Sequence, residues 1–337
     1  MKKSILVFVT ILFTAIFALP VFSALTTPIA KVQLTSSVII TQQQLDAKVK
    51  EYEGTYQNID EATILDAMIS DILITQALER DGFVMTEEQK DSLLAYYRAN
   101  ISASFGVELD DSQFEYVIMQ NYGVSVADYR EYIAQQYVIE SYVTALKNDM
   151  FTNPDNAPTN AEIESFYKKN STSFISAENV KLSHIFFNFG DGQYKKAFDV
   201  ATQINAGKIT FEKAVTQYSE DEDSINSAGE IGWLAMDDST TMTYMGENFF
   251  DKVFDLDAGE ISGVIESLAG YHIVKVTVHN NAKILSIDDK INPADTTTVR
   301  EYIYNYLYEL KLDSVFQSAY LSVISDLKNQ ATIKYLK

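Results

Sequence analysis

VKLSHIFF at residues 180–187 and GYHIVKV at residues 270–276 decide how this chain is interpreted, because each sets a histidine into an apolar strand pattern. Side chains two positions apart on a strand share a face. The neighbours expected on that face are Val180, Leu182 and Phe186 for His184, and Val274, Val276 and Val278 for His272. The chain has only three histidines. Two of them at mirrored strand positions predict that both imidazoles line one cleft or core.

The composition indicates a globular chain of more than one domain. Its 337 residues are enough for two domains with their own cores, and 47% of them are hydrophobic. There are 26 basic and 47 acidic residues, which give a net charge of −21. Phosphate binding needs a basic surface, so nucleic acid is not an expected partner. The absence of cysteine excludes disulfides, thiolate metal sites, a cysteine nucleophile and a lipid-modified N-terminal cysteine.

Residues 1–23 have the pattern of an export signal. Lys2 and Lys3 form a basic start, an apolar run follows at 5–19, and Val21 and Ser23 are small residues suited to a cleavage site. The run is short for a membrane-spanning helix, so cleavage after Ser23 is expected. An uncleaved run acting as a membrane tether is the alternative. The expected location is periplasmic or otherwise extracytoplasmic.

Helical patterns dominate up to about residue 150 and return near the C-terminus. Helix starts are predicted from capping motifs at Thr41, Thr86, Ser125 and Thr159. The segment 152–158 holds two of the five prolines and is interpreted as a linker. Residues 295–328 predict one amphipathic helix, whose apolar stripe needs a partner. The N-terminal region is the simplest partner, which predicts one helical domain built from both ends of the chain.

Between these helical parts the pattern changes to a mixture of strands and helices. The expected elements are a strand at 180–188, helices at 194–206 and 211–218, a loop after 233, a helix near 247–254 and a strand at 271–278. The predicted division of the chain is a signal peptide at 1–23, an N-terminal helical domain at 24–158, a connecting helix at 159–177, a mixed domain at 178–281, and a C-terminal helical segment at 282–337 that packs on the N-terminal domain.

Five stretches in order make residues 178–281 resemble a parvulin-type peptidyl-prolyl isomerase domain. They are LSHI at 182–185, YSED at 218–221, GEIGW at 229–233, FDLDAGEISG at 254–263 and GYHI at 270–273. The flanks resemble the SurA/PrsA-like exported foldases, beginning with VIITQQQL at 38–45. The resemblance implies an α+β, multidomain fold. In that fold a helical chaperone core, formed by the N- and C-terminal segments, carries an inserted parvulin domain with a four-stranded antiparallel sheet and surrounding helices.

The resemblance also implies the residues of an active site. His184 and His272 match the family's histidine pair, and Asp221 matches a position that is cysteine or aspartate in the family. Ser267 matches a hydroxyl residue that hydrogen-bonds near the second histidine. These four are the catalytic residues that the resemblance predicts.

A proline-binding pocket is implied in the same way. Ile231, Met245 and Phe249 match its apolar residues, with Met242 as the alternative to Met245. The chain departs from the usual family pattern at Ala228, Val264 and Ala269, where glycine, proline and serine are usual.

The chemistry of prolyl isomerisation fits such residues. The barrier to rotation about the amide is about 18–20 kcal/mol and is set by resonance, so no bond needs to break. An apolar slot for the proline ring and polar groups that favour the twisted amide are sufficient. No cofactor, metal or nucleophile is therefore expected. Asp221 is expected to act electrostatically on the carbonyl of the twisting bond, while the histidine pair orients it.

Other interpretations of the same residues are weaker. Both strand histidines could be satisfied core residues, and His279 is expected at the surface. Three histidines could suggest zinc, but no i, i+4 pair is present. Residues 220–223 (EDED) resemble a calcium loop only in charge, so a solvated acidic loop with Asp221 alone turned inward is expected. A serine hydrolase would need a Gly-x-Ser-x-Gly motif, which the chain lacks.

The resulting expectation is an exported peptidyl-prolyl cis–trans isomerase that also acts as a chaperone. Its partners would be unfolded or partly folded exported polypeptides with prolyl bonds. Some of the 21 tyrosines could form an exposed aromatic groove for such chains. The alternative is a holdase whose parvulin domain is weak or inactive. Homodimerisation through the helical region is left open.

Overall fold

The computed structural model describes residues 27–53 and 60–336, so the predicted signal peptide lies outside the described residues. The chain divides into two compact units, one of residues 158–307 and one of residues up to 157 together with 308–337. Among the described helices, none combines the length and apolar character needed to cross a membrane.

The helical unit includes the helices predicted to begin after the capping residues Thr41, Thr86 and Ser125. Its helices among the described residues are α1 (Gln42–Glu53), α2 (Glu61–Asp81), α3 (Glu87–Phe105), α4 (Asp111–Tyr122), α5 (Val126–Leu146), α6 (Asn148–Phe151) and the part of α13 (Val299–Gln330) that begins at Tyr308. At α3 the full capping box forms between Thr86 and Gln89. At α5 the Ser125 side chain accepts a hydrogen bond from the backbone N–H of Asp128.

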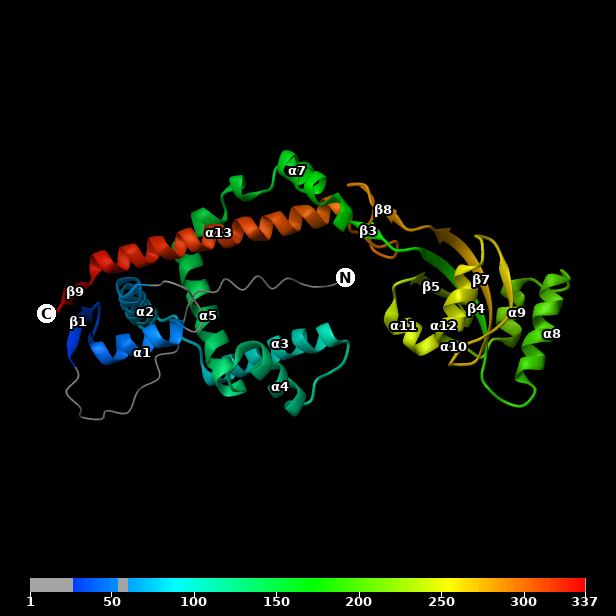
Figure 1. Cartoon of the computed structure of the whole chain (residues 1–337), viewed down its shortest axis with the longest axis horizontal. Helices are drawn as coiled ribbons and strands as arrows, with labels where there is room; N and C mark the ends of the chain where they lie inside the picture. The colour runs from blue at the N-terminus through cyan, green and yellow to red at the C-terminus, as the bar shows by residue number, and fades with distance from the viewer. Residues whose placement is uncertain (1–26, 54–59, 337) are drawn as a thin grey trace. The chain divides into compact units, whose positions relative to one another are not determined.

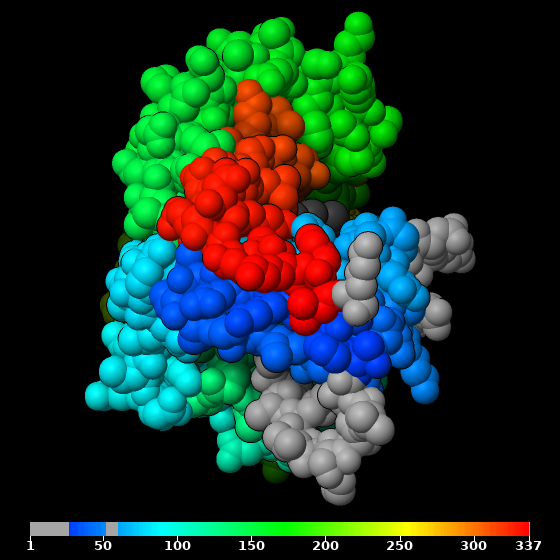
Figure 2. Space-filling model, turned by 90° about the vertical axis from the view of Figure 1, so that its left-hand side faces the viewer, coloured from blue at the N-terminus to red at the C-terminus, as the bar shows by residue number. Residues whose placement is uncertain are grey.

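A three-stranded sheet in this unit was not predicted. Its strands are β1 (Pro28–Gln33), β2 (Ser37–Thr41) and β9 (Thr332–Tyr335), in the order β2-β1-β9. The buried Gln76 of α2 holds the β1–β2 turn, since its carbonyl accepts from the backbone N–H groups of Leu34 and Thr35 and its amide donates to Ser36 O. Figure 2 shows the C-terminal residues in red lying against the N-terminal strands in blue.

The core of the helical unit joins both ends of the chain, as predicted. Ile69 and Leu73 of α2 and Ile139 of α5 pack in the same cluster as Val323 and Leu327 of α13. Figure 1 shows the long α13 in red-orange, and its part from Tyr308 onward belongs to this unit. The C-terminal helix therefore covers its apolar stripe with the N-terminal helices.

The surroundings of Asp71 on α2 disfavour the ionised form of its carboxyl group. Burial raises the pKa of Asp71 from 3.8 to about 7, and nearby Lys48 only partly opposes this. The folded protein then binds a proton that the unfolded chain has released, so stability is full below about pH 4 and falls as the pH rises through about 7. We expect Asp71→Asn to raise the free energy of unfolding by about 1–3 kcal/mol at about pH 8 and by little at about pH 4. Urea unfolding followed by circular dichroism measures this, and equal gains at both pH values would contradict it.

The second unit is built on a four-stranded antiparallel sheet, as predicted. Its strands are β4 (Asn179–Phe187), β5 (Glu230–Ala235), β6 (Ile261–Glu266) and β7 (Tyr271–Asn280), in the order β5-β4-β7-β6 (Figure 1). One face packs on α8 (Gln193–Asn205) and α9 (Phe211–Tyr218). The other face packs on α11 (Ser239–Met245) and α12 (Glu247–Phe254). The short α10 (Glu222–Ile225) precedes β5. Helix α11 lies where the sequence indicated a loop.

A smaller core completes this unit. It holds Ile163 of α7 (Asn160–Asn170), Leu285, and Val299 and Ile303 from the first turns of α13. The two-residue strands β3 (Ile175–Ser176) and β8 (Lys283–Ile284) pair beside it. Residues 282–307 thus group with this unit in the structure, whereas the boundaries proposed from sequence at 158, 177 and 281 remain predictions.

A bulge in β7 changes which side chains share the face of His272. Val278 pairs with Lys181, whereas Val276 pairs with Leu182, so Thr277 is an extra residue. After the bulge the strand faces are exchanged, and the expectation that Val278 lies beside His272 is wrong. His279 takes that face instead. It was expected at the surface, but it is partly buried, and its ring nitrogens lie 2.7 Å from Leu256 O and 2.7 Å from Glu178 Oε1.

Candidate active site

The two strand histidines meet at the centre of the sheet. His184 on β4 lies opposite Val274, and His272 on β7 lies opposite Phe186, so the imidazoles are diagonal neighbours on one face. Their Nδ1 atoms are 3.1 Å apart. His184 is 7% exposed and His272 is 1% exposed. This burial means that the nitrogens need partners within the protein, because water has little access to them.

Two further predicted residues provide those partners. Asp221 Oδ2, at the end of the loop before α10, is 2.8 Å from His184 Nε2. Ser267 Oγ, just after β6, is 2.8 Å from His272 Nε2. The four predicted polar residues therefore form one continuous chain of hydrogen bonds, which we call the histidine array: Asp221, His184, His272 and Ser267.

The direction of the hydrogen bonds in the array follows from its two ends. An ionised carboxylate can only accept, so His184 donates from Nε2 to Asp221 and accepts at Nδ1. His272 then donates from Nδ1 to His184. Ser267 accepts from the backbone N–H groups of Ala269 and Gly270, which leaves its hydroxyl hydrogen for His272 Nε2. Both imidazoles are neutral in this arrangement.

The pKa shifts agree with neutral imidazoles beside an ionised carboxylate. Burial lowers the pKa of His184, although Asp221 opposes this. Burial also lowers the pKa of His272, well below its ordinary value, and the neighbouring His184 lowers it further. Burial alone would raise the pKa of Asp221, but hydrogen bonds from Ser224 and His184 outweigh it and hold that pKa below its usual range.

An apolar cavity lies beside the array. It has a volume of about 420 Å³, and its lining includes the three pocket residues predicted from sequence, Ile231, Met245 and Phe249. The Phe249 ring lies edge-on to His272, with 5.0 Å between the ring centroids, so it touches both the array and the cavity. Ile231 is 44% exposed at the mouth. Met242, the alternative to Met245, packs against the core instead of lining the cavity.

The sequence interpretation missed two residues near Asp221: Ser224, which contacts its carboxylate, and Glu220, which precedes it in the chain and anchors the loop. Ser224 is 3% exposed and donates a hydrogen bond from Oγ to Asp221 Oδ2. Glu220 was expected in a solvated acidic loop, which is wrong. Its carboxylate accepts from the backbone N–H of Asn188, from Gln193 and from Lys196. Burial would raise the pKa of Glu220, but Lys196 and the amide donors lower it to about 2. Gln193 and Lys196, in the first turn of α8, were the residues in the sequence that could have indicated partners for Glu220.

The turn before β5 brings the backbone close to His184. Gly229 has a φ of 79°, and its carbonyl accepts a hydrogen bond from the backbone N–H of His184 at 2.8 Å. Ala228, where the family usually has glycine, has a φ of 56°. It is the one described non-glycine residue with a positive φ. Left-handed backbone costs an L-residue about 1–2 kcal/mol.

We therefore expect Ala228→Gly to raise the free energy of unfolding by about 1 kcal/mol, since the strain relieved exceeds the extra entropy of the unfolded glycine. The single tryptophan, Trp233 in β5, reports on this unit by its fluorescence during urea unfolding. A lowered midpoint for the variant would contradict the strain argument.

Comparisons with known proteins indicate a prolyl isomerase domain in the same part of the chain. Residues 184–278 match the sequence profile of the Rotamase family, the PPIC-type PPIASE domain. Chaperone SurA of Pectobacterium atrosepticum is 24% identical over 298 residues, which cover 85% of this chain and 63% of that protein. Foldase protein PrsA of Halalkalibacterium halodurans is 25% identical over 214 residues, which cover 64% of this chain and 56% of that protein.

Solved structures with similarity to the chain include SurA-like chaperones of Campylobacter jejuni, at 16% identity and a TM-score of 0.36, covering 91% of this chain and 100% of that one. PrsA from Bacillus anthracis is 19% identical with a TM-score of 0.29, covering 77% and 97%. The chain spans roughly half to two thirds of the length of the first curated relatives.

The four-stranded sheet, the histidine array and the profile match together define a peptidyl-prolyl isomerase domain of the parvulin type. Similarity to both kinds of relative extends well beyond that domain. Over much of its length the chain is similar to the SurA and PrsA proteins.

Proposed function

We propose that this chain is an exported peptidyl-prolyl isomerase and chaperone that acts on unfolded or partly folded exported polypeptides. The observation that carries the proposal is the meeting of the histidine array with the apolar cavity at Phe249. A proline ring in the cavity would place its amide beside Asp221. The relatives named as chaperones and foldases, and the signal pattern at residues 1–23, support export and client binding.

The proposed mechanism is electrostatic and forms no covalent bond. Resonance in the planar amide puts negative charge on the carbonyl oxygen, and this charge declines as the amide twists. The Asp221 carboxylate would repel the planar form more strongly than the twisted form, which lowers the barrier. His184 and Ser224 fix the carboxylate on its Oδ2 side. The cavity residues Ile231, Met245 and Phe249 would hold the proline ring during rotation.

A holdase with a weak isomerase domain is the competing proposal, and one observation in the structure favours it. Ala228 holds a strained turn next to Gly229, which contacts the backbone of His184. Assays on the full chain without its signal segment distinguish the two proposals. We expect the chain both to isomerise prolyl peptides and to suppress client aggregation. Suppression of aggregation without isomerisation favours the holdase, and the absence of both activities contradicts the proposal.

A further inference from the structure

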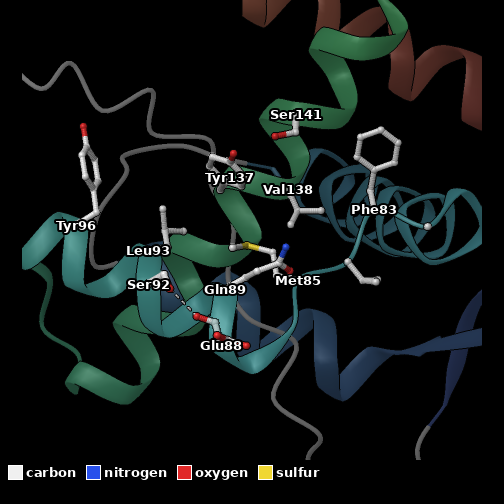
Figure 3. Close-up of a pocket in the computed structure, with 12 residues that line it drawn as sticks. Phe83, Met85, Glu88, Gln89, Ser92, Leu93, Tyr96, Tyr137, Val138 and Ser141 are labelled. Carbon is white, nitrogen blue, oxygen red and sulfur yellow. Dashed lines mark hydrogen bonds between the residues drawn. The ribbon is translucent and has the colours of Figure 1, made fainter.

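A furrow runs along α5 in the helical unit, far in sequence from the histidine array. It consists of two adjoining hollows of about 610 and 630 Å³ that share Tyr137 and Ser141. The first lies between α3, α5 and the α2–α3 connection (Figure 3). The second follows one face of α5 from Tyr137 to Ala145 and reaches Asn148 at the start of α6. We call the two together the α5 furrow.

The walls of the α5 furrow expose large apolar side chains. Val84 is 66% exposed, Tyr96 is 63% exposed and Tyr137 is 51% exposed. Tyr96 stands edge-on against Tyr97, with ring centroids 5.8 Å apart. Exposed aromatic rings on a helical scaffold provide contact area at little cost in conformational entropy.

The furrow also carries negative charge that lacks a basic partner. Glu88 lines the first hollow and Glu140 the second, and neither forms an ion pair in the described part of the chain. Burial raises the pKa of Glu140, and the charge of Asp313 on α13 adds to this. Nearby lysines are already engaged: Lys90 pairs with Glu87 and Glu131, and Lys147 pairs with Asp326. A cation placed beside Glu140 would therefore relieve repulsion between carboxylates.

We propose that the α5 furrow binds extended polypeptide segments that combine aromatic and basic side chains. The inference rests on the proposed chaperone function and specifies the class of client segment it selects. From Tyr137 to Ala145 helix α5 rises by about 12 Å, which an extended chain covers with about four residues. Aromatic side chains of such a segment would stack on Tyr96 and Tyr137, while lysine or arginine would pair with Glu140 and Glu88.

Fluorescence anisotropy with short labelled peptides tests this, using the full chain without its signal segment. The probe contains phenylalanine and lysine but no proline, and its twin has glutamate in place of lysine. The lysine peptide should bind about tenfold more tightly than its twin at low salt. Glu140→Gln should reduce this preference about threefold to fivefold, and Tyr137→Ser should weaken both peptides.

Matched controls are available on α4, which does not line the furrow. Tyr116→Ser removes a tyrosine that is 66% exposed, and Glu115→Gln removes an exposed carboxylate. Both should leave binding unchanged. Equal binding of the two peptides, or equal weakening by the control variants, would overturn the inference.

Three other outcomes are equally informative. A dimer that Tyr137→Ser dissociates would assign the furrow to a second copy of the chain and overturn the inference. Loss of peptide selectivity in a chain that still isomerises prolyl bonds and suppresses aggregation would overturn only this inference. A chain that does neither would contradict the proposed function itself.

Discussion

Asp221→Ala is expected to lower kcat/KM for isomerisation of a prolyl test peptide by about 100-fold, while the affinity for the peptide changes little. Removing a preorganised charge that favours the transition state costs about 2.7–4 kcal/mol in comparable sites. The apolar cavity that holds the proline ring would remain intact, since Asp221 does not line it. Unchanged affinity with a reduced rate is the signature of an interaction that acts in the transition state.

The matched control is Asp223→Ala, which removes an exposed carboxylate two residues away. Its kcat/KM should equal that of the wild type. Asp221→Asn should fall between alanine and aspartate, because the amide can still accept from His184 but carries no charge. An Asp221→Ala protein with undiminished kcat/KM would remove Asp221 from the mechanism.

Gly229→Ala is expected to lower the free energy of unfolding by about 3 kcal/mol or more. An added Cβ would overlap the carbonyl oxygen of His184 and press on Val215 at 3.0 Å. The residue also has a φ of 79°, where an L-residue is strained. The displaced backbone belongs to His184, so isomerisation should be lost together with stability.

Two other glycines separate crowding from strain in this prediction. Gly232 has a φ of 96° but nothing within 4 Å of an added Cβ, so its alanine variant should cost about 1 kcal/mol. Gly263 has neither problem, and its alanine variant should be close to neutral. Urea unfolding followed through Trp233 ranks the three variants. A Gly229→Ala protein no less stable than Gly232→Ala would contradict the steric argument.

Periodicity and capping residues predicted the helices well, because both signals are local. Thr86 and Ser125 fix helix starts through contacts within one turn. The sheet β2-β1-β9 was missed because it depends on pairing between β1 and β9, at opposite ends of the chain. The bulge at Thr277 was missed for a related reason, since only the partner strand reveals the extra residue.

The predicted site residues came from a resemblance, and the structure brings all of them together around two adjoining features. His184, His272, Asp221 and Ser267 form the array, and Ile231, Met245 and Phe249 line the cavity. Their catalytic and binding roles remain predictions. Glu220 and Ser224 escaped prediction because an acidic run looks solvated in sequence. The partners of Glu220 lie on α8 and at Asn188, just after β4.

The central claim is that a neutral pair of buried histidines and an ionised Asp221 catalyse isomerisation without covalent chemistry. The most direct test is the catalysed rate for a prolyl peptide between about pH 5 and 8, measured by exchange NMR so that no coupling protease is needed. Because the pKa values of His184, His272 and Asp221 are all lowered, we predict no loss of rate centred at about pH 6.5, where an ordinary imidazole titrates. No catalysis above the uncatalysed rate, or a loss of rate centred at about pH 6.5 as an ordinary imidazole would give, contradicts it.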